Sequence, residues 1–166
     1  MRTENWCGYN IRFIEKDGEW WAILKDICDA LNLRTDNIAQ SLEPDMLIRV
    51  PVDVSDHYTT GVRSPGENKI RHMLAVNELG IYEALFRSRR LEARKFRRWS
   101  AGVMQKLRSR VGLQGYEVMR MTEPEIQDEI DHMLDNLYWD EEKKCLMESY
   151  TVAGGDVEQR PFMGEL

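Results

Sequence analysis

The chain lacks the features that mark membrane-spanning, secreted and disulfide-stabilised proteins. It contains no run of about 18 apolar residues, which a membrane-spanning helix requires, and its N-terminus is polar rather than an apolar signal core. Its three cysteines, Cys7, Cys28 and Cys145, are widely spaced and form no CxxC pair. An odd number of scattered cysteines argues against a disulfide framework and a structural zinc site. We therefore expect a protein of a reducing cytoplasm.

Signatures of catalysis are also missing. The sequence has no glycine-rich phosphate loop, no GxSxG or HExxH motif and no paired Cys–His signature. Asp128, Asp131, His132 and Asp135 have a helical spacing that could chelate a divalent cation. A solvated acidic helix face explains the same spacing and is favoured. The sequence thus predicts no enzyme, no cofactor and no metal site.

The chain does have enough material for a folded core. Its 166 residues are 42% hydrophobic and 31% charged, which is typical of one soluble domain or of one domain with an appendage. A chain of this length buries roughly two-thirds of its unfolded surface, so its core needs no disulfide or metal to support it.

The net charge of −6 is divided unevenly along the chain. Residues 1–110 carry 19 Lys and Arg against 15 Asp and Glu, whereas residues 111–166 carry 4 against 14. Ten of the basic residues lie from Arg87 to Arg110, where Glu92 is the only acid. This separation favours a polyanion-binding region followed by an acidic appendage. A solvated helix face is the alternative explanation of the basic run.

Local patterns predict a small α+β domain over residues 1–112. The predicted strands are residues 10–14, 20–23, 47–54 and 70–76. The predicted helices are residues 25–33, 37–42, 78–88 and 92–110. Asp17-Gly18 between the first two strands is a strong hairpin signal. Pro51 confines the third strand to an edge, and Asn77 is a suitable N-cap for the third helix.

Two segments of this domain have further implications. The first two predicted helices and the polar turn between them have the outline of a helix-turn-helix, in which Thr35, Asn37 and Gln40 are candidate base-reading residues. Residues 56–69 are rich in Thr, Gly, Ser, Pro and charge, and are therefore expected to form a loop. Gly112 and Gly115 are expected to terminate the basic helix after residue 110.

The basic helix has an apolar face and a charged face. On a helical wheel, Trp99, Val103 and Leu107 fall near Phe96, so these four residues are expected to be buried. Long cations on a rigid helix can neutralise phosphates and release counterions. The candidate DNA contacts are therefore the basic residues of this region: Arg87, Arg89, Arg90, Arg94, Lys95, Arg97, Arg98, Lys106 and Arg108.

Residues 113–166 are expected to form a separate acidic segment. It contains a predicted helix at about 123–138, a short strand at about 145–152 and a loose tail. Thr122 begins a pattern that resembles a capping box, with Pro124 inside the first turn. The helix carries an apolar stripe that consists of Ile126, Ile130, Met133, Leu134 and Leu137.

Three interpretations of this stripe remain open. It could form the interface of a homodimer, which makes its residues candidate oligomer contacts. It could pack on its own domain while the acidic residues shield the basic helix or mimic DNA for a basic partner. It could also be an ordinary amphipathic helix that closes its own core.

Several motifs in order resemble one known family. They are DGEWW at 17–21, LKDICDALNL at 24–33, VNELGIY at 76–82, LFRSRR at 85–90 and ARKFRRW at 93–99. Together they resemble the N-terminal domain of the BRO family, which occurs in phage antirepressors and in baculovirus BRO proteins. Three positions depart from the family pattern: Trp20 replaces a proline, Asn32 a glycine and Leu91 a proline. Asn tolerates a left-handed helix end, so the change at Asn32 is mild.

The resemblance implies a small α+β domain that binds double-stranded DNA. It further implies a phage or prophage regulator of transcription that acts in the lysis–lysogeny switch, in the cytoplasm of the bacterial host. The acidic segment stands where antirepressors carry a larger C-terminal domain. The alternative is an antirepressor that captures a phage repressor protein without contacting DNA itself.

Overall fold

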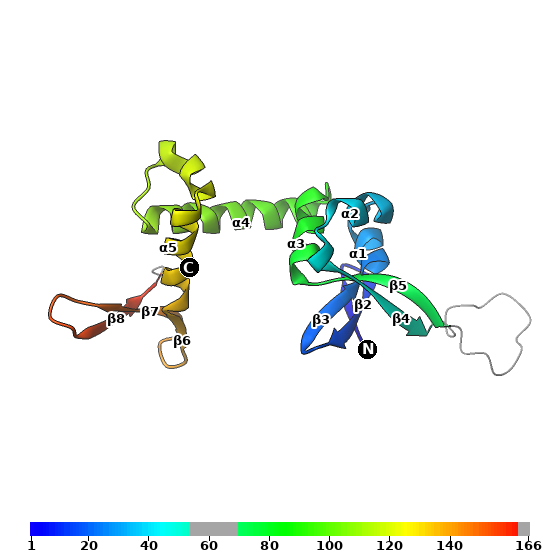
Figure 1. The fold of residues 1–166 in the computed structure, drawn as a ribbon, viewed down its shortest axis with the longest axis horizontal. Coiled ribbons are helices and arrows are strands. Elements are labelled where there is room, and N and C mark those ends of the chain that lie inside the picture. Colours follow the sequence, from blue (N-terminus) through cyan, green and yellow to red (C-terminus); the bar gives the residue numbers. More distant parts are fainter. Residues whose placement is uncertain (54–69, 163–166) are drawn as a thin grey trace, which may run out of the picture. The chain divides into compact units, whose positions relative to one another are not determined.

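The computed structural model describes residues 1–53 and 70–162 and divides the chain into two compact units, Met1–Arg98 and Trp99–Leu166 (Figure 1). The division falls inside helix α4 (Leu91–Arg110), earlier than the domain boundary that the glycines indicated at residue 112. The loop expected at residues 56–69 lies outside the described residues. The mixed helices and antiparallel strands confirm the α+β class.

The first unit is built on a five-stranded antiparallel sheet. Its strands, in spatial order, are β1 (Arg2–Trp6), β2 (Tyr9–Lys16), β3 (Glu19–Ile23), β5 (Ile70–Val76) and β4 (Leu47–Asp53). Asp17 and Gly18, with φ of 55° and 84°, form the tight turn predicted between β2 and β3. Pro51 lies in β4, which is an edge strand as expected. Strand β1 was not predicted, because its largely exposed residues have no apolar alternation.

Helices cover one face of this sheet. They are α1 (Leu24–Leu31), α2 (Thr35–Ser41), the short 3-10 helix η1 (Pro44–Met46) and α3 (Glu78–Arg87) (Figure 1). Ile27 and Leu31 of α1 and Ala84 of α3 pack in one core with Ala22 of β3. Asn32 ends α1 in the left-handed conformation with φ of 55°, so asparagine fulfils the role of the family's glycine.

The opposite face of the sheet has its own apolar cluster. Trp21 and Ile23 of β3 pack there with Val50 and Val52 of β4. Because side chains alternate along a strand, Trp21 and Ile23 face away from Ala22 and the helices. Both faces of the central strands are therefore apolar, which explains the continuous apolar run at the end of β3.

The second unit combines the C-terminal part of α4 with a small sheet. It contains the 3-10 helix η3 (Gly115–Thr122), α5 (Pro124–Asp135) and the antiparallel strands β6 (Leu137–Asp140), β7 (Cys145–Thr151) and β8 (Val157–Pro161). Its core consists of Leu107, Leu113, Ile126, Ile130 and Phe162. None of the helices in the described ranges is long and apolar enough to cross a membrane.

Three expectations for this second unit were wrong. The helix ends at Asp135 rather than 138, because residues 137–140 pair with β7. The tail is not loose as far as residue 162, because β8 pairs with β7 and Phe162 is buried behind it. Thr122 does not cap α5, since its hydroxyl donates to the carbonyl oxygen of Met119 at 2.8 Å.

Candidate nucleic-acid interface

We call the junction of α3 and α4 the corner. The first of its two helices, α3, is held tightly against the sheet. The side chain of Asn77 accepts a hydrogen bond from the backbone N–H of Gly80 at 3.0 Å, which confirms the predicted N-cap. A Cβ atom on Gly80 would stand 2.9 Å from Cβ of Val76. The glycine therefore allows the first turn of α3 to approach the end of β5 closely.

The residues after α3 bind this corner to the end of α1. Ser88 is fully buried, and its hydroxyl donates to the carbonyl oxygen of Leu31 at 2.9 Å. The guanidinium of Arg90 donates to the carbonyl oxygen of Ala30 and lies 4.9 Å from the ring centroid of Tyr9. These contacts hold the start of α4 beside the α1–α2 pair.

Arg97 of α4 also stabilises this corner through hydrogen bonds to backbone carbonyls. Its Nη1 donates to the carbonyl oxygens of Leu85 at 3.1 Å, Phe86 at 3.0 Å and Ser88. The oxygens of Leu85 and Phe86 belong to the last turn of α3 and that of Ser88 to the C-cap, where a helix leaves carbonyls unpaired and favours a cation. Arg90 and Arg97, both candidate DNA contacts, are thus half-buried and bonded to backbone carbonyls.

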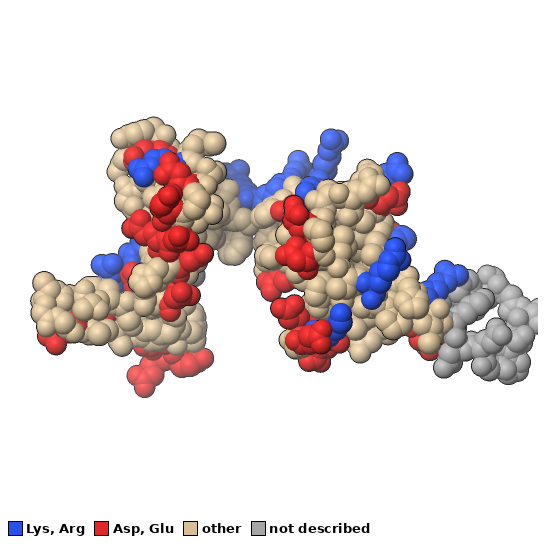
Figure 2. Space-filling model, in the orientation of Figure 1, with Lys and Arg blue, Asp and Glu red and all other residues tan. Residues whose placement is uncertain are grey.

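Four other candidate DNA contacts around this corner remain available to a ligand. Arg89, Arg94, Lys95 and Arg98 are exposed, and none forms a side-chain ion pair or hydrogen bond within the described ranges. Figure 2 shows Lys and Arg side chains gathered along α4. We call these four residues the corner cations. Arg87, the neighbouring candidate, pairs with Glu83 at 3.0 Å.

The candidates at the other end of α4 are less available. Arg108 donates to the carbonyl oxygen of Leu113 and to Oγ of Ser109 at 3.2 Å, so it closes the end of the helix. Lys106 is exposed. The next cation, Arg110, pairs with Glu148, which is only 8% exposed.

The apolar face of α4 is divided between two cores. Phe96 stacks on Tyr82 and Phe86, with ring centroids 5.9 and 6.0 Å apart, and Leu107 is buried in the second unit. Trp99 was expected to be buried, but its side chain is 64% exposed. It lies on the stretch of helix between the two sets of core contacts.

The three candidate base-reading residues lie on α2 but differ in accessibility. Asn37 and Gln40 are exposed, whereas Thr35 is half-buried. Burial is the main cause that raises the pKa of Cys28. Ile38 on the other side of α2 is 4% exposed and packs in the core, so α2 presents its polar side outward.

The acidic segment's apolar stripe packs within the second unit. Ile126 and Ile130 are buried in its core, Met133 and Leu137 pack against that core, and Leu134 is 39% exposed. Most of the stripe therefore closes its own core. A dimer interface at these residues stays a prediction, and Leu134 is the member best placed for one. No group of three or more His, Cys, Asp or Glu side chains within residues 1–53 and 70–162 is arranged to hold a metal.

The comparison with protein families agrees with the motifs. The pattern of the BRO family N-terminal domain matches residues 10–107. The chain therefore belongs to the BRO family, whose N-terminal domain is associated with phage regulators and with DNA binding rather than with catalysis. No curated protein matches the chain, and no solved structure does.

The sequence predicted the basic helix, but it did not predict which of its cations bond to backbone carbonyls and which stay exposed. Arg97 was expected among the candidate DNA contacts, whereas the structure brings it to the carbonyls of α3. The signal that could have identified it is its position after a helix end and a short turn, where a cation on the next helix can reach the unpaired carbonyls. Ser88 was missed as well, although a buried serine commonly bonds to a backbone carbonyl.

Proposed function

We propose that this protein is a phage or prophage regulator of transcription that binds double-stranded DNA through the corner cations. The observation that carries the proposal is the set of exposed cations Arg89, Arg94, Lys95 and Arg98, on a helix start that is fixed by buried hydrogen bonds. The side chains of these cations lose rotamer entropy on binding, but the rigid backbone that carries them adds no further cost of ordering.

The corner cations suit phosphates, and α2 suits base edges. Phosphate contacts fix the position of a protein on DNA, while side chains in a groove read the sequence. Ser88 and Arg90 bond to the end of α1, which α2 follows, and the proposal therefore places exposed Asn37 and Gln40 on the same duplex as the corner cations. Asn and Gln can form paired hydrogen bonds with adenine in the major groove. Thr35 is a weaker candidate because it is half-buried.

The decisive experiment measures how the affinity for a random-sequence duplex depends on salt. Fluorescence anisotropy at about 50 and 200 mM salt compares the full chain with an Arg94→Ala/Arg98→Ala variant. If both arginines contact phosphates, the negative slope of log affinity against log salt becomes shallower by about 2 in the variant. The full chain is preferable to a 1–112 fragment, because Leu107 packs with Ile126, Ile130 and Phe162.

Two matched variants sharpen this test. Lys143→Ala/Lys144→Ala removes the same charge from exposed positions in the second unit and should leave the slope unchanged. Arg94→Lys/Arg98→Lys should retain the slope if the contacts are phosphates, and should lose sequence preference if they are bidentate contacts to guanine. An unchanged slope in the double alanine variant would remove these arginines from the interface.

A second candidate function is capture of a phage repressor protein without DNA contact. It is favoured by the charge of residues 111–166, which carry 14 acidic and 4 basic residues and would repel a DNA backbone. It predicts no duplex binding at either salt concentration. In that case the purified repressor of the same phage would bind the chain directly, and the duplex would compete for the repressor rather than for the chain.

A further inference from the structure

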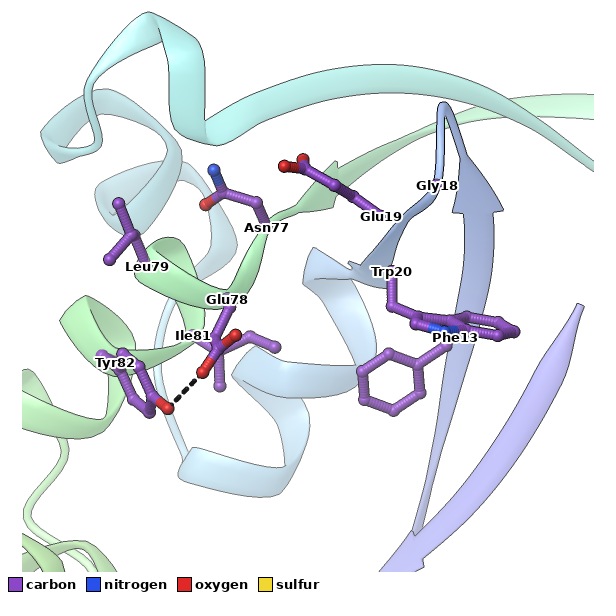
Figure 3. Close-up of a pocket in the computed structure, with 9 residues that line it drawn as sticks. All are labelled: Phe13, Gly18, Glu19, Trp20, Asn77, Glu78, Leu79, Ile81 and Tyr82. Atoms are coloured by element: carbon purple, nitrogen blue, oxygen red, sulfur yellow. Dashed lines mark hydrogen bonds between the residues drawn. The ribbon is translucent and has the colours of Figure 1, made fainter. Parts of the chain in front are cut away.

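A groove separate from the corner cations lies between the first turn of α3 and the β2–β3 hairpin, within the first unit (Figure 3). Its volume is about 770 Å³. The hairpin contributes Phe13, Glu19 and Trp20, and the helix side contributes Glu78, Leu79 and Tyr82. Figure 3 shows the two sets of side chains on opposite walls, with open space between them.

The apolar side chains of this groove are unusually exposed. Trp20 is 45% exposed, Leu79 55% and Tyr82 38%, and all three line the same groove. Single apolar side chains on a surface are ordinary, but a concentration of them in a hollow indicates a binding site. Tryptophan and tyrosine in particular contribute much of the binding energy where proteins meet.

The charged groups of the groove are acidic. Glu19 stands on the hairpin wall and Glu78 on the helix wall, and no Lys, Arg or His is among the described residues that line it. Glu78 accepts a hydrogen bond from the hydroxyl of Tyr82, and this bond raises the pKa of the phenol. The carboxylate of Glu78 therefore stays beside the hydroxyl of Tyr82, where a cation would meet a negative charge next to an aromatic side chain.

We propose that this groove binds a basic and partly apolar peptide segment of a partner protein. A lysine or arginine of the partner pairs with the carboxylate of Glu78 beside Tyr82, and a neighbouring apolar side chain of the partner covers Trp20 and Leu79. Charge complementarity selects this occupant, because the groove offers carboxylates and apolar surface but no cation among its described residues.

The walls of the groove are held in place without a ligand. Asn77 caps α3 and Gly80 lets it approach β5, while the Asp17-Gly18 turn fixes the end of the hairpin. A preformed groove loses little conformational entropy when a peptide binds. The same carboxylates repel nucleic acid, so the groove adds a protein partner to the proposed DNA function rather than extending the DNA surface.

The test is selection of peptides against the full chain. A phage-displayed library of random dodecapeptides is panned on the wild-type chain after depletion on a Trp20→Ala/Glu78→Gln variant. We expect the enriched peptides to contain Lys or Arg next to an apolar residue. A synthetic copy of an enriched peptide should bind the double variant about tenfold or more weakly than wild type, as loss of a tryptophan anchor and a charged contact implies.

Controls separate this groove from general attraction to an acidic chain. Trp139→Ala removes a tryptophan that is 52% exposed in the second unit, and it should leave peptide affinity unchanged. In the wild-type chain, the peptide should shift the backbone amide resonances of residues 77–79 and the indole resonance of Trp20. This measurement serves even if the double variant is unstable.

Three results would overturn the proposal. The library could yield no enriched peptide, or only peptides without a cation. The enriched peptide could bind without shifting the groove resonances. Sedimentation could show a dimer of the wild-type chain that Trp20→Ala dissociates, which would make a second copy the occupant instead of a partner protein.

Discussion

The two ends of α4 are similarly basic but differ in how many cations they leave available. At residues 94–98, Arg94, Lys95 and Arg98 are exposed and only Arg97 is bonded to backbone carbonyls. At residues 106–110, Lys106 is exposed, but Arg108 closes the helix end and Arg110 pairs with Glu148. Carbonyls and carboxylates nearby therefore decide which cations a polyanion can reach, and charge density along the sequence does not.

The difference between the two ends has a physical origin in the acids that each unit supplies. Near the first end the chain is poor in acids, since residues 87–98 carry seven Lys and Arg and a single acid, Glu92. The second end belongs to a unit in which acids outnumber bases, so a cation there finds an internal partner. An arginine that already bonds Glu148 would have to give up that contact before it could meet a phosphate.

The largest effect that tests this comparison is expected from Arg97→Ala. The substitution leaves carbonyls of Leu85 and Phe86 without their charged donor, which should lower the free energy of unfolding by about 2–3 kcal/mol. Urea unfolding measures this. Arg98→Ala, one residue further along, should change stability by less than about 0.5 kcal/mol but should weaken DNA binding. Equal stability losses in the two variants would mean that Arg97 does not hold the corner.

A pair of glycines extends the comparison from charge to packing. Gly80→Ala places a Cβ 2.9 Å from Cβ of Val76 and should destabilise the chain by about 1–2 kcal/mol despite the better helix propensity of alanine. Gly102→Ala in the middle of α4 is the matched control, since a Cβ there meets nothing within 4 Å. It should stabilise the chain by about 0.5–1 kcal/mol. Thermal unfolding of both variants measures the two opposite signs.

A stabilising Gly80→Ala would show that α3 does not need its close approach to β5. It would also weaken the case for a preformed peptide groove, because Asn77 and Gly80 fix the helix wall of that groove.

Much of the first unit could be predicted because its signals are local. The Asp17-Gly18 turn, the Asn77 cap and the edge position of Pro51 each depend on a few neighbouring residues, and each was confirmed. Strand β1 was missed because it is paired only with β2 and its residues are largely exposed, so no apolar face specifies it. The strand forms because pairing with β2 satisfies its backbone hydrogen bonds, although its own sequence has no strand pattern.

The candidate site was less predictable because its decisive contacts link distant residues. Ser88 bonds the carbonyl of Leu31, and Arg90 bonds that of Ala30, about sixty residues earlier in the chain. No helical wheel contains these partners, and so Arg90 and Arg97 were grouped with the exposed cations. The exposure of Trp99 was missed for a related reason: one apolar stripe serves two separate cores, and a wheel treats it as continuous.

The smallest expected effect concerns the far end of α4, where Arg110→Ala removes one of two arginines from Glu148. Glu148 is only 8% exposed, but Arg160 still reaches its Oε2 at 3.1 Å. Because one charged partner remains, the loss of unfolding free energy should be about 1 kcal/mol, measured by urea unfolding. Lys106→Ala, which removes the same charge from an exposed position four residues earlier, should cost less than about 0.5 kcal/mol. If Arg110→Ala instead left stability unchanged and lowered the salt dependence of DNA binding, Arg110 would be a DNA contact, and the two ends of the helix would function alike.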